Sequence, residues 1–376
     1  MATKQETLGQ YFTKKEIVEK LLDLLFSYKA YSKSTSILEP SSGTGNFTDC
    51  LKGKGFKNIK ECEIDPELTT NPTDFFDLAL DNKFDLIIGN PPFSKYNVKD
   101  SYYDLKKYLK NQTPPNSYLI KDIVKKGKDR IENVFILKSI KHLKNANSTI
   151  AFVLPISFFI KNRNRRIKET LLKNFSTVII YQNDKIWFER NIPCCFLILS
   201  DIKKFEGKII NIFQNGKKNE EVFDIKNIYE ELIPQVIFHK NNGYIKNEKG
   251  VPLSEFLADK KVHIRKSFTE NNVSAKNILD KSKIPSNSKV KNFKMAVVRV
   301  GNSSVGKCGL VDQEKDTLND MFYVFDFKNE YTNNKGLKEK LCDQINNNVD
   351  YFRNITCRVG SKSIKKEDIL NFQVCI

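Results

Sequence analysis

The chain has 376 residues, of which 40% are hydrophobic and 29% charged, and its formal net charge is +18. This length allows two domains of ordinary size, and 27 Phe residues can fill their cores. The N-terminus lacks the apolar stretch of a signal peptide, and the longest apolar run, residues 150–160, contains Pro155 and is too short to cross a bilayer. We therefore expect a soluble, cytoplasmic protein that is neither secreted nor bound to a membrane.

The eight cysteines and three histidines are scattered along the chain, and no two cysteines form a Cys-x-x-Cys pair. Zinc sites and disulfide frameworks need clustered ligands or regularly spaced cysteines. We therefore expect reduced thiols and no metal site.

Basic residues concentrate in the middle of the chain. Residues 1–100 carry 13 basic and 15 acidic side chains, residues 101–300 carry 39 and 19, and residues 301–376 carry 11 of each. Lys outnumbers Arg by 54 to 9, as expected of an AT-rich coding sequence, so part of the excess has no binding role. Its uneven distribution still favours a nucleic-acid partner, because a polyanion bound there gains affinity from counterion release.

The predicted elements of the first 200 residues alternate between helices and strands. Apolar residues at helical spacing predict helices over residues 17–25, 132–143 and 163–172. Apolar runs bounded by turn residues predict strands over residues 36–38, 59–64, 85–89, 150–154, 177–181 and 195–199. This alternation is typical of an α/β domain with a doubly wound parallel sheet, in which ligands bind at the carboxyl ends of the strands.

The pattern changes at about residue 206 to short mixed segments joined by Asn-, Lys- and Gly-rich loops. We therefore predict a first domain over residues 1–205 and a second, mixed α+β domain over residues 206–376. Residues 95–127 form a polar, Tyr-rich stretch without periodicity. A stretch of that length is typical of a lid over a site or of a surface insertion.

Three segments in the first domain contain residues that are suited to binding a nucleotide-like ligand. Gly43 and Gly45 follow a predicted strand and let the backbone turn sharply close to a ligand. Glu63, at the tip of the next strand, can accept hydrogen bonds from both ribose hydroxyls of an adenosyl ligand. Asp74 and Phe75 can supply an acceptor for an adenine amino group and an apolar wall.

The most informative motif, Asn90-Pro91-Pro92-Phe93, directly follows the strand predicted over residues 85–89. The prolines stiffen the backbone and keep the residue before each of them extended. The Asn90 side chain and the Pro91 carbonyl are thereby held at the end of a strand, with the Phe93 ring behind them. Two acceptors beside an aromatic face suit a planar amino group. The alternative is a strand that ends in a Pro-Pro turn.

The order of these segments resembles that of the adenine-N6 DNA methyltransferases of the Taq type, in which S-adenosylmethionine motifs precede an Asn-Pro-Pro-Tyr/Phe motif. The resemblance covers residues 8–200 and implies a Rossmann-like methyltransferase domain followed by a target-recognition domain. It implies that the catalytic residues are Asn90, Pro91, Pro92 and Phe93. It implies cofactor binding by Tyr11, Thr13, Glu39, Ser41, Gly43, Gly45, Glu63, Ile64, Asp74, Phe75, Asn90, Pro92 and Phe135.

The chain departs from the pattern of this family at two positions. Lys14 stands where Pro is more frequent, and Ser41 where Ala is usual. Neither change removes a contact that the chemistry requires. The resemblance also places Phe93 and Phe188 beside the substrate base, although Trp187-Phe188 would equally suit a hydrophobic core.

Two groups of basic residues are candidate DNA contacts. Arg163, Arg165 and Arg166 are three of only nine arginines, which codon bias does not explain, and a guanidinium is a good fork for phosphate. The alternative is a solvated helix face. Arg299 and Lys307 flank a glycine turn at residues 301–306 that is similar to a phosphate loop. Because a cysteine replaces the magnesium-binding Ser/Thr and no helical pattern follows, we predict no ATP site there.

The resemblance implies transfer of a methyl group from S-adenosylmethionine to N6 of a flipped-out adenine in duplex DNA, as the modification part of a restriction-modification system. The expected partners are double-stranded DNA and a separately encoded restriction endonuclease that acts on the same site. The methyltransferase itself is expected to be a monomer. The alternatives are an RNA adenine-N6 methyltransferase, a protein glutamine-N5 methyltransferase, and a catalytically inactive nucleic-acid-binding module.

Overall fold

The computed structural model describes residues 9–93, 95–96, 129–161, 163–242, 250–258, 273–356 and 362–375, without the side chains of Lys95, Tyr96, Asp129 and Arg166. The chain divides into two compact units, Met1–Pro234 and Gln235–Ile376. The stretch from 95 to 127, predicted as a lid or insertion, lies outside the described residues except for Lys95 and Tyr96, which form the short strand β4 (Lys95–Tyr96).

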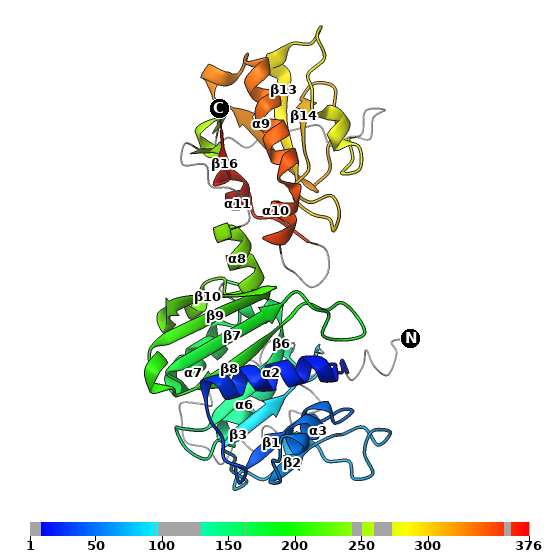
Figure 1. The fold of residues 1–376 in the computed structure, drawn as a ribbon. Coiled ribbons are helices and arrows are strands. Elements are labelled where there is room, and N and C mark those ends of the chain that lie inside the picture. Colours follow the sequence, from blue (N-terminus) through cyan, green and yellow to red (C-terminus); the bar gives the residue numbers. More distant parts are fainter. Residues whose placement is uncertain are drawn as a thin grey trace. The chain divides into compact units, whose positions relative to one another are not determined.

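The first unit is built on an eight-stranded sheet with the order β10-β9-β7-β8-β6-β3-β1-β2 (Figure 1). The strands are β1 (Ile37–Glu39), β2 (Ile59–Glu61), β3 (Leu86–Gly89), β6 (Thr149–Pro155), β7 (Thr177–Asn183), β8 (Cys194–Ser200), β9 (Lys208–Asn215) and β10 (Lys217–Asp224). The helices are α2 (Lys15–Tyr28), α3 (Asn46–Gly53), α6 (Ile131–Lys141) and α7 (Arg165–Asn174), and β4 pairs with β5 (Asp129–Arg130). Every strand and helix predicted in this region is confirmed.

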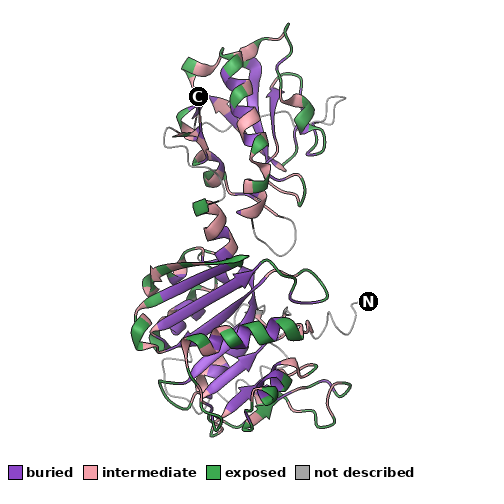
Figure 2. Ribbon diagram, in the orientation of Figure 1, coloured by how far each residue is buried: buried purple, intermediate pink, exposed green. Residues whose placement is uncertain are grey.

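The core lies on both faces of this sheet. Successive side chains of a strand point to opposite faces, and in β6 Ala151 and Val153 join the cluster that also contains Leu21 and Leu22 of α2. α2 lies across this face of the sheet (Figure 1). The central strands are buried along their whole length (Figure 2). The predicted α/β class, with helices packed on a Rossmann-like sheet, is confirmed.

The prediction of a parallel sheet is wrong at β8, and β10, for which no strand is predicted, is antiparallel as well. β8 runs antiparallel to both β6 and β7, and β10 runs antiparallel to β9. Only ten residues separate the end of β7 from the start of β8. A parallel crossover needs a dozen or more residues and usually a helix, so the chain can only turn back.

The predicted domain boundary at residue 206 is displaced. β9 pairs in parallel with β7 in the middle of the first sheet, and its residues Ile209, Ile210 and Ile212 are buried. β10 alternates between exposed and half-buried residues, as an edge strand does. The compact unit therefore runs to Pro234. The loop-rich composition after residue 206 was mistaken for a new domain, because strand propensity does not reveal which sheet a strand joins.

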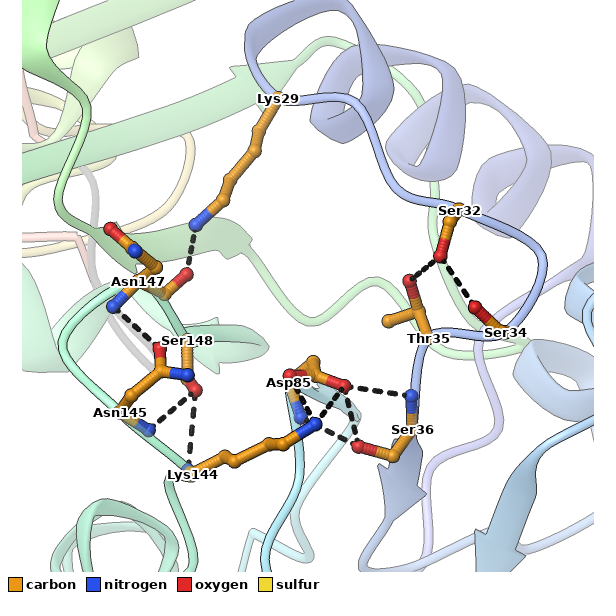
Figure 3. Close-up of polar contacts among 10 residues, drawn as sticks. All are labelled: Lys29, Ser32, Ser34, Thr35, Ser36, Asp85, Lys144, Asn145, Asn147 and Ser148. Atoms are coloured by element: carbon orange, nitrogen blue, oxygen red, sulfur yellow. Dashed lines mark hydrogen bonds and ion pairs between the residues drawn. The ribbon is translucent and has the colours of Figure 1, made fainter.

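The amino ends of β1, β3 and β6 are closed by polar contacts (Figure 3). The Asp85 carboxylate accepts hydrogen bonds from the backbone N–H of Ser36, at 3.0 Å, and from its hydroxyl, at 2.7 Å. Lys144 pairs with the same carboxylate at 3.2 Å, and its backbone N–H donates to the Ser148 hydroxyl. Lys29 donates to the backbone carbonyl of Asn147. These contacts join four segments of the chain at this edge.

The second unit has a four-stranded antiparallel sheet with the order β12-β15-β13-β14. Its elements are α8 (Pro234–Asn242), β11 (Val251–Pro252), β12 (Leu257–Ala258), β13 (Phe293–Val298), β14 (Cys308–Asp312), β15 (Phe322–Phe327), α9 (Lys335–Asn347), α10 (Val349–Asn354), α11 (Lys366–Leu370) and β16 (Gln373–Val374). α9 packs against β14, and β16 pairs with β11. Within the described ranges of both units, no helix has the length and apolar character that crossing a membrane demands.

Candidate active site

The loops that follow β1, β2 and β3 meet at the carboxyl edge of the sheet and are bonded to one another. The Ser41 hydroxyl donates to the Asn90 carbonyl at 3.0 Å. The Ser42 N–H donates to the Cys62 carbonyl at 2.9 Å. The Gly43 N–H donates to the Glu63 carboxylate at 2.7 Å. The three predicted motifs are therefore parts of one site.

The turn between β1 and α3 depends on its glycines. Gly43 has φ +55° and Gly45 has φ +80°, both in the left-handed region that favours glycine. A Cβ atom on Gly43 would lie 2.8 Å from the Phe12 ring, so no other residue fits without displacing that ring. Gly45 leads directly into α3, whose first residue, Asn46, donates from its amide to the Thr13 carbonyl at 2.8 Å.

Glu63 fixes the second wall of the site. One carboxylate oxygen accepts from Gly43, and the other accepts from the backbone N–H of Asp65 at 2.9 Å. Asp65 is buried and accepts from the Gln10 amide at 2.8 Å. Ile64, between the two acids, is 50% exposed, so its apolar side chain is accessible at this edge of the sheet.

Glu39 lies beneath the glycine turn and not in the open part of the site. Its side chain is buried and accepts a hydrogen bond from the Thr48 hydroxyl of α3. Burial raises the pKa of the Glu39 carboxyl well above its ordinary value. In this structure Glu39 therefore joins β1 to α3 and supports the turn from below.

The predicted adenine wall is assembled from two elements. Phe75 and Phe135 are both buried, and their ring centroids lie 5.1 Å apart. Asp74 is exposed, and its carboxylate accepts from the Phe76 N–H at 2.8 Å, which caps the short 3-10 helix Phe75–Asp77. Figure 1 places α6, which carries Phe135, within the sheet-and-helix layers of the first unit.

The residue that supports this wall, Lys138, belongs to no sequence motif. Lys138, one helical turn after Phe135, is 7% exposed, and its ammonium donates to the carbonyls of Phe76 and Leu78. It also lies 5.3 Å from the Phe75 ring centroid. Burial lowers the pKa of Lys138 to about 8. A single lysine among 54 gives no sequence signal for such a role, because only the tertiary structure shows that it is buried.

Asn90 is oriented by the segment that precedes α2. Its amide nitrogen donates to the Tyr11 carbonyl, so the amide oxygen points the other way. That oxygen is buried and has no hydrogen-bond partner in the described part of the chain. The Thr13 hydroxyl is also buried and also has no hydrogen-bond partner in the described residues. Buried acceptors without a partner are costly, so this edge of the sheet is suited to a ligand with N–H or O–H donors.

Three aromatic rings, one of them the Phe93 ring of the Asn90 motif, pack against one another. The Tyr11 and Phe93 rings stack with centroids 5.9 Å apart and an interplanar angle of 29°. Phe188 meets Phe93 edge-on at 6.0 Å and lies 6.2 Å from Tyr11. Phe188 is 1% exposed and is also part of the main core cluster. Phe188 is therefore a core residue that also borders the Asn90 motif. Its place in the core does not exclude a position beside the substrate base.

The N-terminal segment, residues 9–14, ties the whole site together. The Phe93 N–H donates to the Gly9 carbonyl at 3.0 Å, and the Lys14 N–H donates to the Trp187 carbonyl at 2.9 Å. Gln10 also bonds to Asp65, the Tyr11 carbonyl to Asn90, and the Thr13 carbonyl to Asn46. The segment therefore contacts every part of the site except the Phe75–Phe135 wall.

The arginine cluster lies at the start of α7, in the segment that follows β6, and takes part in none of these contacts. Arg165 pairs with Glu169 of the same helix at 3.2 Å and lies 5.6 Å from the Tyr229 ring centroid. Arg163 is exposed, and the side chain of Arg166 lies outside the described residues. The DNA contact predicted for this cluster therefore stays a prediction.

The glycine turn of the second unit is a different structure from that of the first. It connects β13 to the antiparallel strand β14, and no helix follows it. A Cβ atom on Gly306 would lie 2.6 Å from the Cβ atom of Phe352, so this glycine permits close core packing. The described part of the chain also holds no cluster of three or more His, Cys, Asp or Glu side chains that could bind a metal ion.

Part of the chain is similar to known proteins. Residues 12–188 match the family model of the Eco57I restriction-modification methylases. The Type II methyltransferase M.HincII of Haemophilus influenzae is 31% identical over 223 residues, which cover 58% of this chain and 41% of that protein. M.AccI of Acinetobacter calcoaceticus is 24% identical over 288 residues, or 67% and 50% of the two chains.

A viral protein is similar as well. The modification methylase CviBIII of Paramecium bursaria Chlorella virus NC1A is 30% identical over 169 residues, or 40% of this chain and 39% of that protein. The chain thus spans two fifths to half of the length of these relatives. The matched region begins just after Tyr11 and contains the glycine turn, Glu63, the Phe75–Phe135 wall, the Asn90 motif and Phe188.

Among solved structures, the type IIG restriction endonuclease BpuSI superposes with a TM-score of 0.51 at 11% identity, over 96% of this chain and 58% of that one. At this identity the likeness concerns the fold alone. The mixed sheet with helices on both faces is a Rossmann-like methyltransferase fold, and the fold and the family match imply S-adenosylmethionine as the cofactor.

The residues at the carboxyl edge fit this cofactor. The Gly43–Gly45 turn leaves no Cβ atom in the way of a ligand, and Ile64 offers an exposed apolar surface beside it. Glu63 brings a carboxylate to the same place. The buried Thr13 hydroxyl offers a hydrogen-bonding group that nothing in the described part of the chain satisfies.

Proposed function

We propose that this protein is a site-specific DNA methyltransferase that methylates the N6 amino group of adenine in duplex DNA. The observation that carries the proposal is the orientation of Asn90. Its amide nitrogen is held by the Tyr11 carbonyl, and its buried oxygen is left as an acceptor beside Phe93. The match to restriction-modification methylases supports DNA as the substrate.

S-adenosylmethionine would be held by the loops at the carboxyl edge of the sheet. Glu63 would accept from the ribose hydroxyls, and Asp74 with the Phe75 and Phe135 rings would hold the adenine. Thr13 and Tyr11 of the N-terminal segment would flank the methionine portion. When bound, the cofactor supplies an electrophilic methyl group on a sulfonium.

Asn90 and Pro91 would act on the target base by position. An adenine amino nitrogen is a poor nucleophile because its lone pair is delocalised into the ring. If the Asn90 oxygen and the Pro91 carbonyl accept the two N–H hydrogens, the nitrogen becomes pyramidal and its lone pair turns towards the methyl group. The methyl carbon would pass from sulfur to this nitrogen, with the electron pair of the broken carbon–sulfur bond left on sulfur. The nitrogen would then lose one proton to solvent, so no strong base is needed. Such alignment is worth several kcal/mol.

The base would have to leave the duplex, because its amino group is otherwise paired. Unstacking costs a few kcal/mol. Stacking on Phe93, with Phe188 at its edge, offsets about 1–3 kcal/mol of that cost. The second unit would carry target recognition, and a separately encoded endonuclease acting on the same sequence would complete a restriction-modification system.

The test is nucleoside mass spectrometry of unmethylated duplex DNA after incubation with the protein and S-adenosylmethionine, with an Asn90→Ala variant as the control. The proposal expects N6-methyladenine from the wild-type protein alone. Cofactor binding, measured by calorimetry, should survive in the variant. A protein that binds the cofactor but modifies only RNA or a protein glutamine would overturn the proposal, and so would one that binds no cofactor.

A further inference from the structure

The second unit contains an open basic depression of about 330 Å³. It lies beside β15, and its lining is Arg299, Tyr323, Ser363, Ile364, Lys365, Lys366 and Glu367. Three of these residues are basic and one is acidic. The sequence singled out only Arg299, together with Lys307, which is not part of this lining.

The depression is made by two segments that are far apart in the chain. Arg299 directly follows β13, and its N–H donates to the Met321 carbonyl at 2.8 Å. The Ile364 N–H donates to the Arg299 carbonyl at 2.9 Å, and the Gly301 N–H donates to the Lys362 carbonyl at 2.9 Å. These backbone bonds hold residues 363–366 in place beside Arg299, so the basic groups are gathered by the fold and not by a flexible tail.

The Arg299 guanidinium is held before any ligand arrives. Its Nε donates to the Asp320 carbonyl, and its Cζ atom lies 5.7 Å from the centroid of the Tyr323 ring. The Asp320 carboxylate lies 3.9 Å away but is 93% exposed, so this ion pair is weak. Nη1 has no hydrogen-bond partner in the described part of the chain. An oriented guanidinium with free N–H groups is a good receptor for a tetrahedral oxyanion.

We infer that this depression binds a backbone phosphate of DNA, with Arg299 as the fork and Lys365 and Lys366 as the accompanying positive charges. The inference rests on the proposed function for the identity of the nucleic acid. Ser363 adds a hydroxyl donor to the lining, as is frequent among phosphate contacts. An open depression suits a phosphate on a continuous chain better than it suits a small enclosed ligand.

The inference predicts a change in the salt dependence of DNA binding. The probe is a random-sequence duplex of about 30 base pairs, titrated between about 50 and 200 mM salt. Arg299→Ala should weaken binding several-fold and lower the slope of log K against log salt by about one. Lys365→Ala/Lys366→Ala should lower the slope by a similar amount.

The control is Lys289→Ala/Lys291→Ala, which removes two exposed charges of the same unit outside the depression. It should change the slope less than the Lys365/Lys366 pair does. Arg299→Lys should recover part of the slope, because it restores the charge without the fork. Thermal unfolding of each variant should match that of the wild-type protein, and Arg299→Lys serves as the test if Arg299→Ala does not fold.

The outcomes separate this inference from the proposed function. If the wild-type protein methylates DNA but the Arg299 and Lys365/Lys366 variants keep its slope, the depression does not bind phosphate. A loss confined to the methylated sequence would overturn the phosphate assignment in favour of base reading. If the variants lower the salt slope of DNA binding but the wild-type protein methylates no adenine, the proposed function is wrong and the phosphate site is supported. A wild-type protein that binds no duplex DNA overturns both.

Discussion

Polar residues lie at both the amino ends and the carboxyl ends of the strands in the first sheet. The two sets differ in whether their polar atoms have hydrogen-bond partners. At the amino end, Asp85, Ser36 and Lys144 bond to one another, and the Ser148 hydroxyl accepts from two backbone N–H groups (Figure 3). At the carboxyl end, the Asn90 oxygen and the Thr13 hydroxyl are buried without a partner in the described residues.

This difference distinguishes the Asp85 contacts from the Asn90 site, although the amino end also holds one buried ring nitrogen, Nε2 of His142, without a partner in the described residues. Polar groups that satisfy one another stabilise the fold and have nothing left to offer a ligand. Buried groups without a partner cost free energy in the unliganded protein, and a ligand that supplies the missing donor recovers it. Substitutions at the carboxyl end should therefore change catalysis, and substitutions at the amino end should change stability.

The largest effect is expected for Asn90→Asp. The new carboxylate would place an acceptor against the Tyr11 carbonyl, where the amide now donates. We expect kcat to fall by about 10²–10³ at neutral pH, the size typical of losing one preorganised hydrogen-bonding group. Once protonated, the introduced carboxyl can donate to the Tyr11 carbonyl, so the ratio of variant to wild-type kcat should rise as the pH falls. A flat ratio across the pH range would show that the Tyr11 carbonyl does not orient this side chain.

A smaller effect is expected from a pair of glycine substitutions at the two ends of α3. Gly43 and Gly55 both have positive φ, +55° and +88°. A Cβ atom on Gly43 would meet Phe12 at 2.8 Å, whereas one on Gly55 would have its nearest contact at 3.7 Å, with the flexible Lys33 side chain. Both alanines should lose about 1–3 kcal/mol of stability through strain. Only Gly43→Ala should weaken S-adenosylmethionine binding, by about tenfold or 1.4 kcal/mol.

Calorimetric titration with the cofactor and thermal unfolding of both variants measure these two quantities separately. If Gly55→Ala weakened cofactor binding as much as Gly43→Ala, the effect would come from general destabilisation and not from the glycine turn.

The smallest effect is expected at the amino end, for Asp85→Asn. Burial acts to raise the pKa of Asp85, but the hydrogen bonds from Ser36 and Lys144 outweigh it, and the pKa is lowered. Since the folded-state pKa lies below the unfolded value, this carboxylate stabilises the protein above the unfolded pKa, and the stabilisation is lost as the pH falls through the folded-state pKa. We expect a loss of about 1–2 kcal/mol at neutral pH.

Denaturant unfolding at several pH values measures this effect. The difference between the wild-type and Asp85→Asn proteins should shrink in acid, and kcat at neutral pH should be unchanged. A change in kcat with no change in stability would remove the distinction between the two ends of the sheet.

Several parts of the site were predictable because they follow from local sequence. The strands that end at Glu39 and Gly89, the glycine turn after the first and the Asn-Pro-Pro-Phe motif after the second all lie where they were predicted. Parallel strands bring their carboxyl ends to one edge, so predicting β1, β2 and β3 correctly was enough to bring their motifs together.

Other parts depended on contacts between distant residues. The direction of β8 and the membership of β9 follow from strand pairing, which strand propensity does not encode. The burial of Lys138 and the bond from Gln10 to Asp65 also arise only when the elements pack.

The sequence by itself determined the α/β class, the two-part organisation and the residues at the carboxyl edge, because periodicity and motif spacing are local properties. Only the tertiary structure decided where the first unit ends, which way the Asn90 amide points, and that Arg299 shares a depression with residues 363–366. The physical reason is the same in each case. These features are set by hydrogen bonds and packing between residues tens of positions apart, and such partners are chosen only when the chain has folded.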